Sequence, residues 1–278
     1  MEITAALVKE LRDETNVGMM ECKKALIEAG GDKEKAVKFL RERGLAIAGK
    51  KASRTAKEGN VAAEIFNGGK SGIMIEVNCE TDFVTRNESF KDLVVQLVGI
   101  AKGIQGSLAD AAKDLVVSKI ASIGENIIVR RNVRYDAQGE GIIASYIHLG
   151  GKVGVLVEVG CGQAETAANP AFKEVVKDIT LHIAACNPGY LVRKDVPETV
   201  LASEKDIYAK QVTGKPANIV EKIVLGKLEK FYSQTCLVEQ AFVKDPEQSV
   251  TDLLANKGKE FGDVLAIRRF TRFQVGVE

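Results

Sequence analysis

Two glycine–lysine stretches have part of the spacing of a phosphate-binding loop, in which backbone N–H groups and a lysine hold the phosphates of a nucleotide. Residues 44–51 read GLAIAGKK, but Lys51 stands where the motif needs a hydroxyl for Mg²⁺, and the stretch follows a helix-like segment instead of a strand. Residues 69–71 read GKS, but Glu64 stands where the motif requires its first glycine. We therefore predict that neither stretch binds a nucleotide.

Histidine and cysteine, the other residue types that often catalyse reactions or bind metals, show no matching pattern. His182 falls near the apolar face of a helix-like segment, so we expect a packed core histidine, whereas for His148 a structural role and a surface contact both remain open. No CxxC pair occurs, so neither a zinc site nor a redox motif is indicated. We predict no catalytic residue, no metal site, no cofactor and no enzymatic activity, with inert free thiols in a reducing compartment. The cysteines are Cys22, Cys79, Cys161, Cys186 and Cys236.

Residues 78–87, NCETDFVTRN, could bind another protein. They lie between a strand-like apolar run at 72–77 and a helix-like run at 89–100. Phe83 and Val84 therefore stand among polar residues in a connection, and connections lie mostly on the surface. Either the ring of Phe83 packs into this protein's own core, or it is exposed for a partner.

An internal duplication bears on this choice. Residues 58–92 align without gaps on residues 140–174, and 14 of the 35 positions are identical, where chance would give about two. Each copy is predicted to form a strand, a Gly-Gly-Lys turn, a strand, a loop and a helix. The second copy has Glu165 where the first has Phe83. Because the shared fold does not need an apolar ring there, the surface contact is favoured over packing specific to the first copy.

The remaining elements complete an α+β fold with a duplicated core and antiparallel sheets. Residues 1–44 are predicted to form three short helices, with Asp32 capping the third and Gly44 ending it. Residues 196–232 resemble an antiparallel helical pair that turns at 213–216, and the alternating tail at 264–277 is predicted to add a strand to the second half. We expect an N-terminal module at 1–52, a first core half at 58–140, a second half at 141–187 and 237–278, and an inserted helical hairpin at 188–236.

The composition is that of an ordinary soluble globular protein, with 45% hydrophobic and 28% charged residues in 278. The formal charge is +1, which argues against a dedicated nucleic-acid binder. No apolar run approaches the roughly 20 residues that a membrane helix needs. The first residues, MEITAALVKELRDE, are charged from the second position, unlike a secretory signal, so we expect a cytoplasmic protein with no membrane contact.

Several stretches together resemble the bacterial elongation factor Ts family over nearly the whole chain. They are LVKELRDETNVGMMECKKAL near the N-terminus, NCETDFV in the first repeat, IGENI at 123–127, and SYIH with GVLVEV in the second repeat. The resemblance implies a translation factor that acts as the guanine-nucleotide exchange factor of elongation factor Tu. It also implies that the first module is of the ubiquitin-associated type, with a duplicated core and a helical hairpin inserted in its second half.

The resemblance further implies roles for individual residues. In the family, the phenylalanine that corresponds to Phe83 inserts between helices of the GTPase domain of elongation factor Tu and disturbs its Mg²⁺ and phosphate sites. Thr81, Asp82 and Val84 complete this motif, and the precise role of the aspartate stays open. Other family contact positions fall on Lys23, Ile123, Gly124 and His148.

Two features of the family bear on what the resemblance leaves open. Many members have a further C-terminal helical module, whereas this sequence stops at Glu278, so contacts of that module are not carried over. The inserted hairpin mediates dimerisation in some members only, so a homodimer through the hairpin is an expectation beside a monomer.

An alternative function comes from the basic residues that follow the N-terminal module. Residues 50–57 contain Lys50, Lys51, Arg54 and Lys57, which could bind phosphates of RNA, as in an RNA- or ribosome-associated protein. The near-neutral charge of the chain disfavours this reading, and a solvated tether is the simpler one. We therefore expect no direct nucleic-acid contact.

Overall fold

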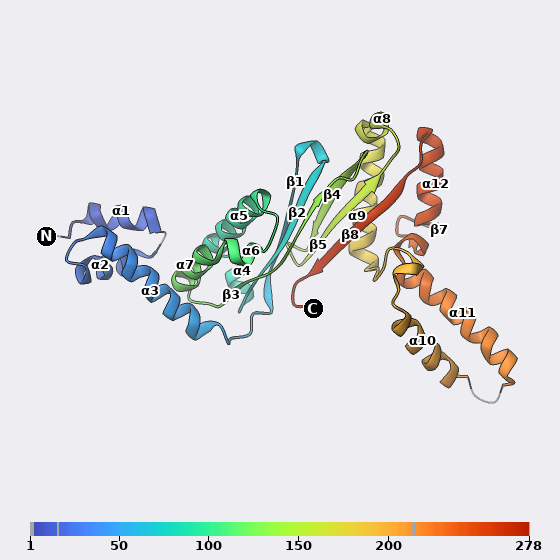
Figure 1. Cartoon of the computed structure of the whole chain (residues 1–278), viewed down its shortest axis with the longest axis horizontal. Helices are drawn as coiled ribbons and strands as arrows, with labels where there is room; N and C mark the ends of the chain where they lie inside the picture. Colours follow the sequence, from blue (N-terminus) through green and yellow to red (C-terminus); the bar gives the residue numbers. More distant parts are fainter. Residues whose placement is uncertain (1–2, 16, 213–214, 278) are drawn as a thin grey trace.

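The computed structural model of this chain describes residues 3–15, 17–212 and 215–277. Figure 1 shows an elongated molecule with a three-helix module at one end, two sheets flanked by helices in the middle, and a helical hairpin that projects from the far end. Both larger sheets are antiparallel, so the predicted α+β class is confirmed. Among the described residues, no helix is long and apolar enough to cross a membrane.

The N-terminal module consists of α1 (Ala5–Thr15), α2 (Met19–Glu28) and α3 (Lys33–Lys51). Its buried centre contains Leu11 and Leu26, which come from the apolar stripes of the first two helices. Asp32 caps α3 as predicted, because its side chain accepts a hydrogen bond from the Lys35 backbone N–H at 3.0 Å.

The prediction that Gly44 ends the third helix is wrong, because α3 continues to Lys51. Gly44 is buried inside the helix, where a Cβ atom would lie 3.5 Å from Cγ1 of Val117 in α7 (Lys113–Ile123). At this distance a Cβ atom would be in ordinary van der Waals contact, so the site could also hold an alanine. A glycine inside a helix is about 1 kcal/mol less favourable than alanine, and the packing of α3 on α7 offsets that term.

Each half of the core has a three-stranded sheet, in which the first two strands form a long hairpin and the third strand pairs with the second. The first sheet has the order β1-β2-β3 and the second the order β4-β5-β8, so the tail joins the second sheet as its alternation predicted. The strands are β1 (Glu58–Phe66), β2 (Ser71–Cys79), β3 (Ile127–Asp136), β4 (Gly141–His148), β5 (Val153–Gly160) and β8 (Ala266–Gln274).

The duplication predicted from the sequence is visible in the strand register. Gly59 pairs with Asn78 in the first sheet, and the equivalent Gly141 pairs with Gly160 in the second. A bulge follows Glu76 in the first sheet, and the second has a bulge at the equivalent position. The two copies therefore share details that no general property of antiparallel sheets would impose.

The two sheets pack face to face through a shared apolar cluster. Its members come from all six strands, namely Val61, Met74, Tyr135, Ile143, Leu156 and Phe273. Gly154 lets the sheets approach, because a Cβ atom there would lie 2.3 Å from Cγ1 of Val61. Two equivalent ion pairs cross between the two copies of the repeat, 58–92 and 140–174, namely Lys70 with Glu140 at 2.9 Å and Lys152 with Glu58 at 2.5 Å. Each half therefore contacts the other through the same residues, as subunits of a twofold dimer do.

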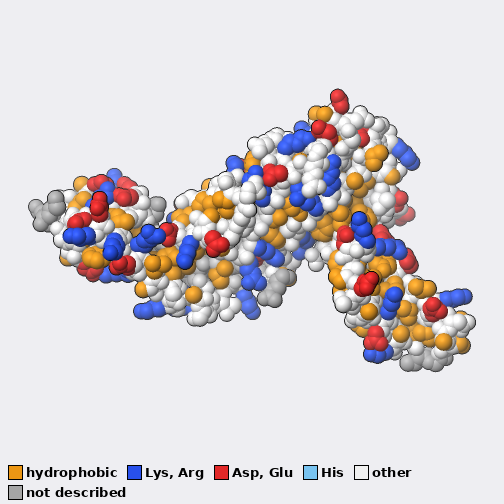
Figure 2. Space-filling model, viewed as in Figure 1, with side chains coloured by type: hydrophobic (Ala, Val, Ile, Leu, Met, Phe, Trp, Pro, Cys, Tyr) orange, Lys and Arg blue, Asp and Glu red, His pale blue; other side chains and the backbone are white. Residues whose placement is uncertain are grey.

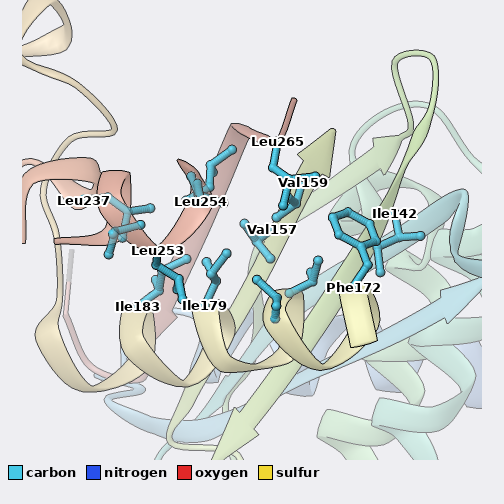
Figure 3. Close-up of a cluster of buried hydrophobic side chains, with 14 of the residues drawn as sticks. Ile142, Val157, Val159, Phe172, Ile179, Ile183, Leu237, Leu253, Leu254 and Leu265 are labelled. Atoms are coloured by element: carbon cyan, nitrogen blue, oxygen red, sulfur yellow. The ribbon is translucent and has the colours of Figure 1, made fainter. Parts of the chain in front are cut away.

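Helices cover the outer faces of both sheets. The helices of the first half are α4 (Asp82–Thr85), α5 (Glu88–Gly103), α6 (Leu108–Ala111) and α7. Those of the second half are α8 (Ala164–Ala168), α9 (Pro170–Cys186) and α12 (Val250–Phe261), beside a small hairpin of β6 (Ala241–Phe242) and β7 (Asp245–Ser249). Figure 3 shows Phe172, Ile179 and Ile183 on one side of α9, pointing toward Val157 and Val159 of β5.

The projecting hairpin consists of α10 (Glu198–Lys210) and α11 (Ala217–Thr235), which confirms the predicted helical pair. Short 3₁₀ turns at Arg193–Asp195 and Leu237–Glu239 connect it to the core. The predicted turn at 213–216 includes Thr213 and Gly214, which lie outside the described residues.

His182 is a packed core histidine, as its place on an apolar helix face predicted. Its ring is fully buried on α9, and Nε2 lies 2.9 Å from Oε1 of Gln240. Nδ1 accepts a hydrogen bond from the Val243 backbone N–H at 3.1 Å. Since Nδ1 accepts, Nε2 carries the proton and donates to Gln240. This ring joins α9 to residues 240–243, which follow the helical hairpin in the chain.

Candidate partner-binding site

The ring of Phe83 is 78% exposed on α4, a helix of only four residues. The next residue, Val84, is buried in the apolar cluster of the first half. Successive side chains of a helix point about 100° apart, so a turn anchored through Val84 directs the preceding side chain outward. The alternative that the Phe83 ring packs into this protein's own core is therefore wrong.

Asp82 presents a carboxylate next to this ring. Its Oδ2 atom accepts from Nη2 of Arg86 at 3.1 Å; the Arg86 side chain is exposed and that of Asp82 is about half exposed. The Asp82 carbonyl accepts from the Thr85 hydroxyl at 2.6 Å, which closes the short turn. An exposed ion pair of this kind contributes little stability, so the carboxylate remains accessible to a donor on another molecule.

Glu125 fixes the backbone that leads into the turn. One of its oxygens, Oε2, accepts from the backbone N–H groups of Glu80 at 3.1 Å and Thr81 at 3.0 Å. The other, Oε1, accepts from the Thr81 hydroxyl at 2.6 Å. Gly124 makes this placement possible because it ends α7 in the left-handed conformation, with φ of 87°. The sequence analysis did not identify Glu125 as part of the site.

A second set of contacts connects this loop to the end of α3. The Glu80 carboxylate accepts from the Asn126 backbone N–H at 2.6 Å and lies 3.5 Å from Nη1 of Arg54. The Asn126 side chain donates to the Arg54 carbonyl at 2.8 Å, and the Lys51 ammonium donates to the Gly124 carbonyl. The exit of α3, residues 124–126 and residues 80–81 therefore form one hydrogen-bonded unit, which we call the loop junction.

The structure brings some of the predicted contact residues together and separates others. Ile123 packs on the core of the first half at the end of α7, and Gly124 follows it within the loop junction, beside Thr81. Lys23 is exposed on α2 of the N-terminal module. His148 is exposed at the end of β4, with its ring stacked 5.7 Å from that of Tyr146.

Leu149, which follows His148, is an apolar surface residue that the sequence analysis missed. Its side chain is 71% exposed, and its backbone is left-handed with φ of 49°. The first copy has Asn67 at the equivalent position with φ of 52°. Asparagine adopts this conformation more readily than leucine does. A leucine at 149, aligned with an asparagine at 67, is therefore the sequence signal that could have identified Leu149.

Cys79, which precedes the loop, is not a nucleophile. Burial raises the pKa of its thiol to about 12, and its Sγ atom donates to the Thr81 carbonyl at 3.2 Å. The thiol is thus a packed donor that supports the same loop. Across residues 3–15, 17–212 and 215–277, no group of three or more His, Cys, Asp or Glu side chains could hold a metal ion.

The chain matches the family described as Elongation factor TS over residues 80–277. It is 44% identical over 291 residues to elongation factor Ts of Trichlorobacter lovleyi, an alignment that covers 99% of this chain and 93% of the relative. The chain belongs to the elongation factor Ts family. Among other members, elongation factor Ts of Bdellovibrio bacteriovorus is 44% identical with the same coverage, and that of Nitratidesulfovibrio vulgaris is 43% identical over 99% of this chain and 96% of its own length.

Elongation factor Ts membership confirms the resemblance that the sequence motifs indicated. The matched range begins at Glu80, so it contains the exposed turn, residues 123–126, the rest of the first half after β2, and the second half of the core. The relatives align over nearly the whole chain, the N-terminal module included. The protein is thus an elongation factor of protein biosynthesis.

Proposed function

We propose that this chain binds elongation factor Tu in its GDP-bound form and promotes release of GDP by inserting Phe83 into the GTPase. A GTPase holds its nucleotide through Mg²⁺ and a backbone cradle around the phosphates. A factor that binds the empty state more tightly than the loaded state must weaken nucleotide binding by the same factor. Such a protein forms and breaks no covalent bond, so it needs no catalytic residue.

The observation that carries the proposal is the exposed ring of Phe83 on an anchored turn. Exposing an apolar ring of this size to water is unfavourable, so covering it with a partner's surface is favourable. Burying a phenylalanine side chain contributes about 1.5–3 kcal/mol, which corresponds to a bias of about 10- to 150-fold. Displacement of the Mg²⁺ and phosphate sites by this ring is the step we propose.

Further contacts must add to the ring, because this bias alone is modest. We propose that Thr81, Asp82 and Val84 shape the contact around Phe83, with the accessible Asp82 carboxylate accepting hydrogen bonds from the GTPase. Additional contacts of the same partner are proposed for Lys23, Ile123, Gly124 and His148. Their distribution over the N-terminal module and both core halves fits a partner that spans the elongated molecule.

Release of labelled GDP from purified elongation factor Tu tests the proposal. Phe83→Ala is expected to slow release by about 10- to 150-fold, the factor that the buried ring contributes. The fold should be retained, because the ring is exposed. Val95→Ala is the matched control, since Val95 is also exposed, at 69%, but lies on α5. Release by Phe83→Ala at the rate of the unaltered chain would refute the insertion step.

The alternative of an RNA- or ribosome-associated protein has less support. Of the basic residues at 50–57, Lys51 donates to the Gly124 carbonyl and Arg54 pairs with Glu80. Both cations therefore contribute to the loop junction. Binding to phosphates would weaken steeply with salt, so a gel shift at low and moderate salt distinguishes this alternative from GDP release.

The division into modules and the oligomeric state are also proposals. We propose an N-terminal module at 1–52, core halves at 58–140 and at 141–187 with 237–278, and an inserted hairpin at 188–236. We also propose that the protein acts in the cytoplasm.

Figure 2 shows apolar side chains between charged ones on the hairpin, and Ile207 and Leu225 are among the exposed apolar residues. A homodimer through this surface is proposed, and sedimentation of the whole chain tests it.

A further inference from the structure

Glu125 makes contacts that bear on how Phe83 is presented. Its carboxylate accepts from two successive backbone N–H groups, those of Glu80 and Thr81, and from the Thr81 hydroxyl. Thr81 is the N-cap residue of α4, so these bonds fix the backbone immediately before the turn that carries the ring. Both partners of each bond belong to the first half of this chain, so the bonds form without any partner protein.

The second half of the core has an equivalent arrangement without an exposed ring. The Asp263 carboxylate accepts from the backbone N–H groups of Gly162 at 2.8 Å and Gln163 at 3.0 Å, the residues that correspond to Glu80 and Thr81. Each half therefore ties its loop to the residues before its third strand. Only the first half carries a phenylalanine on the short helix that follows.

We propose that Glu125 is a positioning residue for nucleotide exchange, which orients Phe83 by holding residues 80 and 81 before the partner arrives. The inference rests on the proposed function. Ordering a backbone residue on binding is unfavourable, and a group that is already ordered avoids that term. The loop junction extends the same restraint, because Glu80 is in turn held by Asn126.

Four single variants and one double variant test the role of Glu125. The readouts are the maximal rate of labelled GDP release from elongation factor Tu and the half-saturating concentration. Glu125→Ala should lower the maximal rate about tenfold, the equivalent of one backbone residue left to be ordered. The half-saturating concentration should stay within about twofold, since the surrounding contacts are intact. In the Phe83→Ala background, Glu125→Ala should cause no further loss, because it acts through the ring.

Asp263→Ala is the matched control for stability. It removes the equivalent backbone hydrogen bonds from the second half, so its Tm should fall about as far as that of Glu125→Ala, while its release rate stays unchanged. Glu125→Gln preserves the side-chain shape and one acceptor oxygen. It should give a loss smaller than that of Glu125→Ala, and it replaces that variant if the alanine protein does not fold.

The outcomes separate this inference from the proposed function. If Phe83→Ala slows release but both Glu125 variants release GDP at the normal rate, the positioning role is wrong and the insertion step stands. A further tenfold loss in the double variant would also overturn the role, because Glu125 would then act independently of the ring. If Phe83→Ala itself releases GDP normally, the proposed function fails and the positioning role fails with it.

Discussion

At the scale of single residues, the two copies of the core offer internal comparisons at equivalent positions. Leu149 and Asn67 both have a left-handed backbone at the tip of the long hairpin, with φ of 49° and 52°. The left-handed conformation is about 1–2 kcal/mol less favourable for an ordinary residue, and asparagine tolerates it better. Leu149 therefore carries a local strain that the first copy avoids.

Leu149→Asn is expected to raise the free energy of unfolding by about 0.5–1 kcal/mol, because it relieves part of this strain. Urea denaturation measures the change. The reverse exchange, Asn67→Leu, should destabilise by a larger amount, since it also removes the 3.1 Å hydrogen bond from the Asn67 side chain to the Ser71 hydroxyl. Equal stabilities for both variants and the unaltered chain would show that neither tip is strained.

The direction of Phe83 could be predicted from the sequence, whereas the residue that holds its loop could not. The duplication supplied the first, because Glu165 at the equivalent position shows that the fold does not require a ring. Glu125 is 44 residues from Thr81 and lies outside the gapless alignment, so no local pattern connected the two. Contacts of this kind depend on where a helix ends in space, which periodicity does not determine.

At the scale of elements, His182 links α9 to the segments at the base of the hairpin. Burial lowers the pKa of its imidazole below the ordinary 6.5, although the hydrogen bond with Gln240 acts in the opposite direction. Protonation would place a second N–H, at Nδ1, against the donating N–H of Val243. The unfolded chain therefore binds the proton more readily than the folded chain does.

The free energy of unfolding should consequently fall as the pH drops below 6.5 and continue to fall until the pH reaches the lowered pKa. The slope from this group is at most about 1.4 kcal/mol per pH unit. Equilibrium unfolding at pH 5 to 8 should show a shallower dependence for His182→Gln than for the unaltered chain. Parallel curves for the two proteins would contradict this account.

Predictions for helices were reliable where the apolar face decided the outcome and failed where packing overrode a local signal. The tail strand and the two hairpin helices follow from periodicity, and both are present. Gly44 has the local character of a helix end, but α3 packs on α7 and continues through Gly44 to Lys51. The sequence of α3 alone contains no record of α7, so this extension could not be foreseen.

At the scale of the whole molecule, the two sheets depend on small residues at their contact. Gly154→Ala should destabilise the chain by about 1–3 kcal/mol, because the new methyl group would overlap Val61 and Met74. Val61→Ala in the same chain should restore part of the loss, and thermal unfolding measures both.

Gly99→Ala is the control for that substitution. Gly99 lies in α5 with no atom within 4 Å of its missing Cβ, so alanine should stabilise the helix by up to about 1 kcal/mol. If Gly154→Ala were as stable as Gly99→Ala, the result would contradict a contact between the sheets at Gly154 that is too close for a methyl group.

The reciprocal pairs Lys70–Glu140 and Lys152–Glu58 have a consequence for refolding. Each half offers its counterpart the same set of charges and apolar groups, and nothing in that match requires both to come from one polypeptide. Only the four residues 137–140 separate β3 from β4. Two molecules that refold together can therefore exchange halves. When denaturant is removed by dilution, we expect an intertwined dimer whose fraction rises with the protein concentration during refolding.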